Sequence, residues 1–225
     1  MDKIKMMSKL MEEQAGDGAL RQNSTSPNLS WNVRFTKRLV DVLGAVLGLV
    51  LFAPAFLVIY LAIKREDRGK VIFRQERVGF RGRTFTLYKF RSMIERAEVK
   101  GKPQLCKEED HRLTRVGRFL RTHHLDELPQ LWNVLKGDMS LVGPRPERRF
   151  FVDQIVAINP DYELLYVLRP GLFSEATLYN GYTDTMAKML KRLNMDLHYL
   201  YNRSLWLDAK IIFLTVFSIL TGKKF

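Results

Sequence analysis

The stretch Leu125-Asp-Glu-Leu-Pro-Gln-Leu-Trp-Asn-Val-Leu-Lys-Gly-Asp-Met-Ser-Leu-Val-Gly-Pro-Arg-Pro146 places two carboxylates, Asp126 and Glu127, inside the most basic third of the chain. Two carboxylates roughly 5 to 6 Å apart repel by ~3 kcal/mol at an effective dielectric near 20, so a partly buried pair needs a cation such as Mg²⁺ or Arg. Such a carboxylate can act as nucleophile, base or metal ligand. The pair also suits an ordinary helix start, where the helix dipole favours acidic residues. Alone, it leaves both interpretations open.

The rest of this stretch predicts a helix followed by a fixed turn. Pro129 suits a first helical turn, and an apolar face follows at helical spacing, made of Leu128, Leu131, Trp132 and Leu135. Prolines on both sides of Arg145 limit its backbone freedom. A pre-oriented guanidinium matches phosphate oxygens two at a time, although a structural turn with a surface arginine fits the same residues.

Arginines recur every third residue just before the acidic pair, at Arg112, Arg115, Arg118 and Arg121. A helix would gather them in one stripe, which is either an anion-binding face or a solvated one. Residues 64–149 carry a net charge of +10 (22 Lys and Arg against 12 Asp and Glu) out of +13 for the chain. This local excess predicts an anionic partner such as nucleic acid, lipid headgroups or a sugar nucleotide.

Other compositional signals exclude several classes of site. Cys106 is the only cysteine, so no intramolecular disulfide can form. The four histidines lack zinc-ligand spacing, and the chain has neither a Walker loop nor a Rossmann glycine fingerprint. A nucleotide must therefore be held in another way.

The 22 residues from Val42 to Ile63 carry no charge and are long enough to span a hydrocarbon layer. Pro54 lies past the middle and bends or breaks a helix. Basic pairs flank both ends, Lys37-Arg38 before and Lys64-Arg65 after, which draws both ends to the cytoplasmic side. Asp41 precedes the run and would pair with Lys37 or Arg38 one turn away. A re-entrant helix-break-helix satisfies these features, and a single-pass anchor remains the alternative.

Two further segments have a recognisable pattern. The runs 71–78 and 84–90 predict a β-hairpin, with Lys89 and Arg91 at its exit, ready for a phosphate before a helical stretch at 94–99. Near the C-terminus, 205–220 predicts an amphipathic helix in the membrane interface or, alternatively, a buried core helix. Its broad apolar face comprises Trp206, Ile212, Phe213, Val216, Phe217 and Leu220.

The predicted fold class is α+β: a mostly helical, membrane-associated domain with a small β-hairpin, a re-entrant membrane helix hairpin and interfacial amphipathic helices. The expected organisation is a flexible leader at 1–33, the helix-break-helix at 34–66, a catalytic domain at 67–200 and an interfacial helix at 201–225.

Taken together, these motifs resemble the bacterial sugar transferase family, the small monotopic phosphoglycosyl transferases, over about residues 34–222. The residues that carry the resemblance are Lys37-Arg38, Asp41, Pro54, Gln75–Gly79, Lys89–Met93, the long motif Leu125–Ser140, Gly143–Pro146, Arg169–Gly171 and Ser204–Asp208.

This resemblance implies transfer of a phospho-sugar from a UDP-sugar to undecaprenyl phosphate with release of UMP, starting a surface glycan. It implies a monotopic protein in the bacterial inner membrane, in contact with its lipid, with the catalytic domain on the cytoplasmic face. No nucleic acid takes part, and a homodimer is compatible with it.

The family assigns Asp126 as the nucleophile that forms an acyl-phosphate sugar intermediate, and Glu127 to the metal. Mg²⁺ would offset the charge of a carboxylate that approaches a diphosphate. Asp126 and the Arg121 backbone are further metal contacts. The residues implied to bind substrate are Lys89, Arg91, Arg118, Asp138 and Arg145; those of the membrane hairpin are Lys37, Arg38, Asp41 and Pro54.

Two departures from the family pattern stand out. Ala53 replaces the serine that often precedes the hairpin proline, so the break would rest on Pro54 and its neighbours. After Arg169-Pro-Gly171, the run 172–180 replaces a common Thr-Gly-Trp-Ala-Gln pattern, which leaves the sugar open. From another class, a membrane-tethered basic module that binds nucleic acid or anionic lipid is the competing hypothesis.

Overall fold

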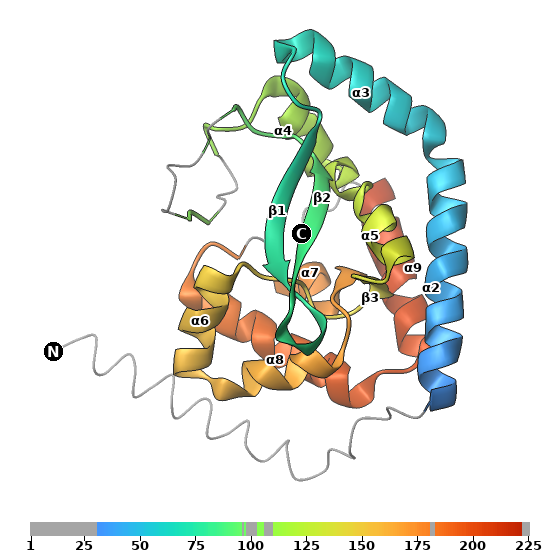
Figure 1. Ribbon diagram of the computed structural model, residues 1–225, viewed down its shortest axis with the longest axis vertical. Helices are drawn as coiled ribbons and strands as arrows, with labels where there is room; N and C mark the ends of the chain where they lie inside the picture. Colours follow the sequence, from blue (N-terminus) through green and yellow to red (C-terminus); the bar gives the residue numbers. More distant parts are fainter. Residues whose placement is uncertain (1–30, 96, 98–102, 106–109, 181–182, 222–225) are drawn as a thin grey trace, which may run out of the picture.

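The structure is a computed structural model that describes residues 31–95, 97, 103–105, 110–180 and 183–221. Helices dominate it, and two small two-stranded sheets lie among them (Figure 1). Residues 1–30 of the predicted leader (1–33) lie outside the described residues. Residues 31–33 belong to the first described helix instead.

A bent pair of helices runs along one edge of the molecule (Figure 1). α2 (Trp31–Leu51) and α3 (Ala53–Asp67) meet at Phe52 with a bend of 59°. Pro54 lies in the first turn of α3, where its missing N–H leaves a carbonyl of α2 without a helical partner. The predicted break at Pro54 is therefore confirmed. Among the described helices, none is long and apolar enough to cross a membrane by itself, whereas α2 and α3 together meet that length and composition.

The predicted β-hairpin is also confirmed. β1 (Ile72–Val78) pairs antiparallel with β2 (Thr84–Phe90), so that Phe73 lies opposite Lys89. The short 3₁₀ turn η2 (Phe80–Gly82) joins the two strands. Asn133, fully buried, ties β2 to the helix that follows the acidic pair, because its side chain accepts the Tyr88 N–H at 3.1 Å and donates to the Thr86 carbonyl at 2.7 Å.

The second sheet was not expected from the sequence. β3 (Ser140–Val142) pairs parallel with β4 (Gly171–Phe173), at the point where the long motif meets the Arg169-Pro-Gly171 motif. The two backbones come so close that a Cβ on Gly171 would lie 2.1 Å from the Gly143 nitrogen. Glycine is required here because no side chain fits between the strands.

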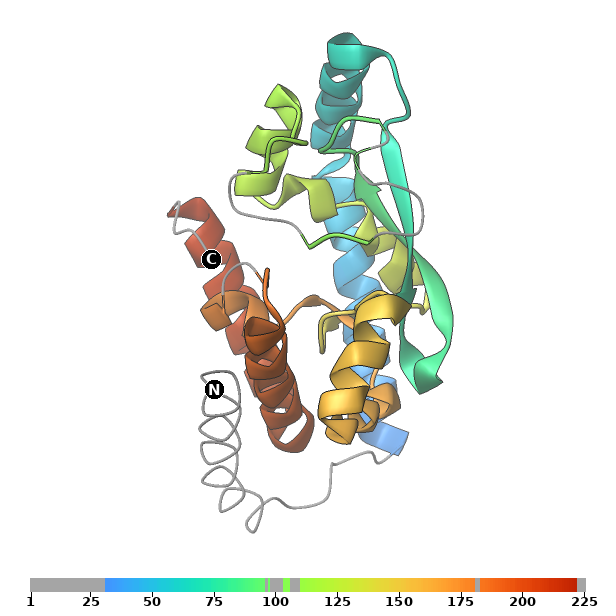
Figure 2. The ribbon, with the colours of Figure 1, turned by 90° about the vertical axis from the view of Figure 1, so that its left-hand side faces the viewer.

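The remaining elements complete the domain. They are α4 (Arg115–Thr122), η3 (Leu125–Glu127), α5 (Gln130–Lys136), α6 (Arg149–Ile158), η4 (Pro160–Val167), α7 (Glu175–Asn180), α8 (Met186–Asn202) and α9 (Leu205–Leu220). Figure 2 shows the hairpin on one side of the molecule and α8 and α9 on the other. The main core draws on α2, α5, α6, α8 and α9, and a smaller cluster packs α3 against β2 and α4.

Three local predictions were wrong. Arg112 is not part of a helical stripe, because α4 begins at Arg115, and its buried guanidinium pairs with Asp110 instead. Residues 94, 95 and 97 are not helical, and the rest of the predicted helix at 94–99 lies outside the described residues. Trp132 is exposed and Val134 is buried in its place, because α5 turns a different face to the core.

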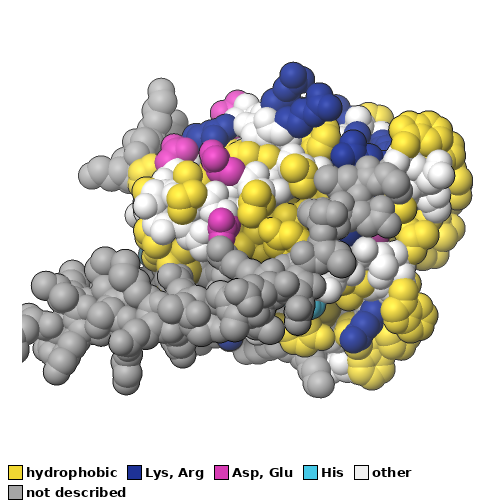
Figure 3. Space-filling view, turned by 90° about the horizontal axis from the view of Figure 1, so that it is seen from below, with side chains coloured by type: hydrophobic (Ala, Val, Ile, Leu, Met, Phe, Trp, Pro, Cys, Tyr) yellow, Lys and Arg dark blue, Asp and Glu magenta, His cyan; other side chains and the backbone are white. Residues whose placement is uncertain are grey.

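α9 has a buried face and an exposed apolar face, so the core-helix alternative is confirmed for the first, and the interfacial helix stays a prediction. Ile211 and Thr215 are buried in the domain, whereas Trp206 (80% exposed) and Phe213 (67% exposed) point outward with Val216 and Phe217. Ile212 is half-buried, and the Leu220 side chain lies outside the described part. α2 and α3 also expose many large apolar side chains, and hydrophobic atoms gather at the right-hand edge of Figure 3, the side on which α2 lies in Figure 1.

Candidate active site

Asp126 and Glu127 lie together in η3, the short 3₁₀ turn between α4 and α5. The turn begins at His124, whose left-handed backbone (φ 55°, ψ 17°) reverses the chain after α4. Such a conformation is uncommon for a residue other than glycine and recurs at functional sites. Both carboxylates are buried, at 5% exposure for Asp126 and 8% for Glu127.

Glu127 is held by two cations from distant parts of the sequence. The Lys89 Nζ of β2 donates to Glu127 Oε1 at 2.6 Å. The Arg145 guanidinium contacts both carboxylate oxygens, at 2.7 Å to Oε1 and 3.5 Å to Oε2. Burial raises the pKa of Glu127, but the charges and hydrogen bonds of Arg145 and Lys89 outweigh it and hold the pKa well below its usual range. Glu127 is therefore ionised at neutral pH.

Asp126 has the opposite environment. No group among the described residues donates a hydrogen bond to its carboxylate, although the charges of Lys89, Arg121 and Arg145 act on it. Burial raises the pKa of Asp126, and the Glu127 charge adds to that effect. Its oxygen lone pairs thus stay available for a substrate, whereas Glu127 accepts two hydrogen bonds at Oε1 and one at Oε2.

The other predicted binding residues lie at different distances from this pair. Arg91 is buried at the end of α3, where it pairs with Asp67 and with Glu95 at 3.4 Å, so its known contacts do not include the acidic pair. Asp138 accepts from Asn133 at 3.2 Å and pairs with Lys136 at 3.1 Å, beside β2. Arg118 is exposed on α4.

Arg121 and His124 border the acidic pair from the α4 side. The Arg121 carbonyl accepts the His124 N–H at 3.2 Å, and the Arg121 charge acts on both His124 and Asp126. Burial lowers the pKa of His124, and Arg145, Lys89 and Arg121 lower it further against the effect of Glu127. A neutral imidazole thus borders the site. Sequence reasoning gave His124 no role, because neither its spacing nor its type signalled one.

The predicted hairpin residues connect α2 to α5 and α9. Asp41 is buried and pairs with Lys37 at 3.0 Å, as expected for one of the two predicted partners. Lys37 also pairs with Asp208 of α9 at 3.0 Å. Arg38 instead donates to the carbonyls of Val134 and Leu135, at 2.7 and 2.9 Å, where a cation suits the C-terminal end of α5.

An apolar groove with a volume of about 480 Å³ lies next to this connection. α2 forms one wall and residues from α5, both strands of the parallel sheet and α9 form the other. Leu128, two residues after Asp126 in the chain, is one of the residues that line it. The residues that line it are Val40, Leu43, Gly44, Leu47, Gly48, Phe52, Leu128, Leu131, Leu141, Leu172, Phe173 and Ile212.

The oxygen ligands at the acidic pair fit Mg²⁺ better than a transition metal. Among the described residues, no group of three or more His, Cys, Asp or Glu side chains could hold a metal ion. Mg²⁺ needs no such cage, since it is usually held by one or two carboxylates and by the phosphates of the substrate. The Asp126 carboxylate, buried without a hydrogen-bond donor from the described residues, is a suitable first ligand.

The sequence of the chain matches a known protein family and several known proteins. The profile of the family described as bacterial sugar transferase matches residues 32–222. The chain is 46% identical over 188 residues, 84% of its length, to the UDP-N-acetylgalactosamine-undecaprenyl-phosphate N-acetylgalactosaminephosphotransferase of Aeromonas hydrophila. It is 45% and 44% identical to UDP-glucose:undecaprenyl-phosphate glucose-1-phosphate transferases of Klebsiella pneumoniae and Caulobacter vibrioides, over 80% and 90% of its length. The matches span 44%, 39% and 75% of these three relatives, so the chain covers less than half of the first two.

Proposed function

Because the chain belongs to the bacterial sugar transferase family, we propose that it transfers a sugar 1-phosphate from a UDP-sugar to undecaprenyl phosphate, with release of UMP. The names of its relatives support both substrates, and they differ in the sugar, so the sugar stays open. The observation that carries the proposal is the contrast within the acidic pair: Glu127 is held by Lys89 and Arg145, and Asp126 is left without a hydrogen-bond donor from the described residues.

The transfer takes place in two steps on Asp126. An Asp126 oxygen attacks the phosphorus that bears the sugar, so that a carboxyl O–P bond forms while the bond to the UMP oxygen breaks. An oxygen of undecaprenyl phosphate then attacks the same phosphorus, and the carboxylate of Asp126 leaves. The covalent step divides one difficult displacement between two anions into two easier ones.

The surrounding cations prepare the site for a diphosphate. Lys89 and Arg145 contact Glu127 and also act on Asp126 through their charges, so they lie where phosphate oxygens would enter. Arg145 can bind two such oxygens at once. Arg91 pairs with Asp67 at the end of α3 and so holds the chain that follows β2. It would bind substrate only after it leaves Asp67.

Mg²⁺ would be held by Asp126 and Glu127, with the Arg121 carbonyl as a further oxygen ligand. When bound, it neutralises charge on the phosphate oxygens during transfer. Glu127 would contribute a lone pair that Lys89 and Arg145 leave unused.

The outer face of the molecule supports a location in the inner membrane, with the acidic pair on the cytoplasmic side. α2, α3 and α9 expose apolar side chains, and the basic pairs Lys37-Arg38 and Lys64-Arg65 lie at the two ends of the uncharged run. The apolar groove beside Leu128 can take part of an isoprenoid chain whose phosphate reaches Asp126. A re-entrant helix pair keeps both ends, and hence the site, at one surface.

The test is UMP release from a panel of UDP-sugars by the protein in vesicles with undecaprenyl phosphate and Mg²⁺. Asp126→Asn should abolish turnover and leave vesicle binding intact. Mass spectrometry of the quenched parent reaction, without acceptor, should find the phospho-sugar on Asp126. An adduct on another side chain, or no UMP from any sugar with folded protein, would exclude the mechanism.

The competing hypothesis, a basic module that binds nucleic acid or anionic lipid, makes the reverse prediction. Its binding would fall steeply with salt and would not respond to Asp126→Asn. Several cations of the basic segment are engaged in internal pairs, among them Arg77, Lys89, Arg91, Arg112 and Arg145, so its net charge overstates the charge offered to a polyanion.

A further inference from the structure

A further buried carboxylate, that of Glu147, lies two residues after Arg145. Glu147 is 6% exposed and accepts from Arg192 Nη2 at 2.6 Å and from Arg77 Nη1 at 2.9 Å. Burial alone would raise the pKa of Glu147, but Arg192 and Arg77 lower it to about 2. Glu147 is therefore ionised at neutral pH. The proposed chemistry gives this charge no role. A buried charge is costly unless it is fully paired, so its place beside Arg145 needs a reason.

Hydrogen bonds from Arg77, Val78 and Gly171 hold the backbone on both sides of Arg145. Arg77 Nη1 also donates to the Pro146 carbonyl at 3.2 Å, and the Val78 N–H donates to the Glu147 carbonyl at 2.8 Å. On the other side, the Gly171 N–H donates to the Pro144 carbonyl at 2.9 Å. Since both neighbours of Arg145 are prolines, few backbone torsions remain free.

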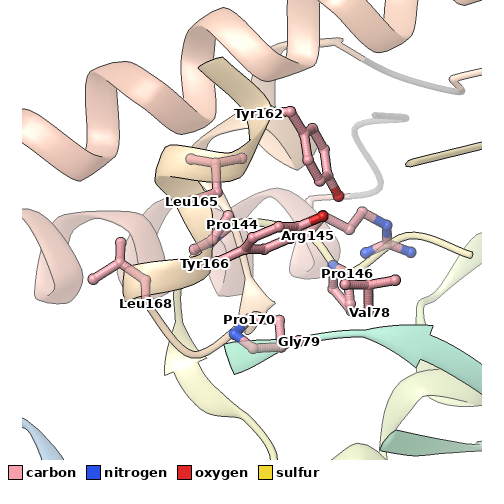
Figure 4. A pocket seen from close by; sticks show the side chains of 10 residues that line it. All are labelled: Val78, Gly79, Pro144, Arg145, Pro146, Tyr162, Leu165, Tyr166, Leu168 and Pro170. Atoms are coloured by element: carbon pink, nitrogen blue, oxygen red, sulfur yellow. The ribbon is translucent and has the colours of Figure 1, made fainter. Parts of the chain in front are cut away.

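α8 also contacts the segment that carries Arg145. Arg192 and Asp196 lie one turn apart on α8 and are both buried. Arg192 binds Glu147, and the charges of Arg192 and Arg145 act on the Asp196 carboxylate. The Tyr162 hydroxyl points toward the Arg145 side chain from η4 (Figure 4). α8 thus binds the residue two positions after Arg145, while the Arg145 guanidinium contacts Glu127.

We propose that Glu147 and Arg192 are positioning residues that act through Arg145. They do not touch substrate; they set the place of the guanidinium against Glu127 and, on the proposed function, against the phosphate of the sugar nucleotide. A misplacement of about 1 Å in such a group can cost about a hundredfold in rate. A second interpretation, an ion pair that only stabilises the fold, predicts no special relationship between these residues and Arg145.

A double-mutant cycle separates the two interpretations. Glu147→Gln and Arg192→Lys are made in the parent protein and in Arg145→Ala, and kcat and KM for UMP release are measured with thermal unfolding of each variant. In the parent we expect each substitution to lower kcat/KM at least tenfold. In the Arg145→Ala protein the same substitutions should lower it less than twofold, because the group they position is gone. Equal losses in both backgrounds would overturn the proposal.

Two further arrangements keep the cycle decisive. If Glu147→Gln does not fold, Arg192→Lys, which keeps the charge, carries the cycle alone. Lys188→Gln is the matched control, because it breaks a half-buried ion pair with Asp184, 2.7 Å long, at the start of the same helix; it should change kcat/KM less than twofold. If the parent releases no UMP, the proposed function fails, and the cycle is then measured on UMP affinity, where the same loss of effect in Arg145→Ala is required.

Discussion

The Asp41 carboxylate of α2 accepts a hydrogen bond from the Ser140 hydroxyl of β3 at 3.0 Å. The two residues are 99 positions apart, and the same oxygen also accepts the Leu141 N–H at 3.0 Å and meets Lys37. This buried junction attaches the bent helix pair to the strand that leads to Arg145. Asp41 therefore contributes, with the contacts of Lys37 and Arg38, to the position of α2 relative to the site.

Asp41→Ala should destabilise the protein strongly. It leaves the Leu141 N–H without its acceptor, the Ser140 hydroxyl with the Val142 carbonyl alone and Lys37 with Asp208 alone, a loss of about 3 kcal/mol in the free energy of unfolding. Ser140→Ala removes one donor and should cost about 1 kcal/mol. Denaturant unfolding in detergent measures both, and a change below about 0.5 kcal/mol for Asp41→Ala would contradict the assignment.

Pro54→Ala should straighten the helix pair towards a single spanning helix. Alanine restores the N–H that proline lacks, so the 59° bend loses its cause. In a Cys106→Ser background, a cysteine at Asn32 is labelled from either side of intact vesicles. We expect it to be protected from the outside in the parent and to react from the outside in Pro54→Ala. Reaction from the outside in the parent would disprove the re-entrant arrangement, and identical protection in both proteins would show that Pro54 does not maintain it.

Arg145→Lys should impair catalysis although it keeps the charge. Lysine cannot contact both oxygens of Glu127, and we expect kcat/KM for UMP release to fall about tenfold to a hundredfold. Arg83→Lys, at an exposed residue of the hairpin loop, is the control and should stay within twofold of the parent. Equal activity of Arg145→Lys and the parent would remove Arg145 from the site.

Asp196 should make the protein less stable as the pH rises towards neutrality. Burial raises its pKa to about 7 against the lowering effect of Arg192, from an ordinary value of 3.8. The folded protein then binds a proton that the unfolded chain has lost, so stability is full below about pH 4 and falls by up to about 1.4 kcal/mol per pH unit until pH 7. Above pH 7 this contribution levels off.

Asp196→Asn should remove that decline. Unfolding midpoints of the parent and Asp196→Asn are compared from pH 5 to 8, and the difference between them should shift in favour of Asn as the pH rises. A constant difference over this range would show that Asp196 does not titrate there.

The outward face of α9 should contribute to membrane binding. Trp206→Ser with Phe213→Ser removes two exposed apolar side chains and should weaken vesicle binding about tenfold while the unfolding midpoint stays unchanged. Ile158→Ser, at an exposed apolar residue of α6, is the control. Unchanged sedimentation with vesicles for the double variant would show that this face does not enter the membrane.

Local pattern was sufficient for several elements. The hairpin, the break at Pro54 and the pairing of Lys37 with Asp41 all depend on residues within one turn or one hairpin, where spacing fixes geometry. The arginine spacing predicted a helical position for Arg112, and this was wrong. Arg112 precedes α4, and its guanidinium pairs with Asp110, two residues away. The parallel pairing of β3 with β4 could not be predicted, since strands of three residues carry almost no periodic signal.

For the site, the sequence by itself determined the acidic pair, the cations available to it and the family to which their motifs point. The tertiary structure decided which carboxylate is engaged and which is left for chemistry. That decision rests on β2 bringing Lys89, and the loop after β3 bringing Arg145, to Glu127. It also decided that Arg192 of α8 pairs with Glu147, two residues after Arg145. Contacts between residues 18 to 45 positions apart depend on how elements pack, and no local spacing encodes that.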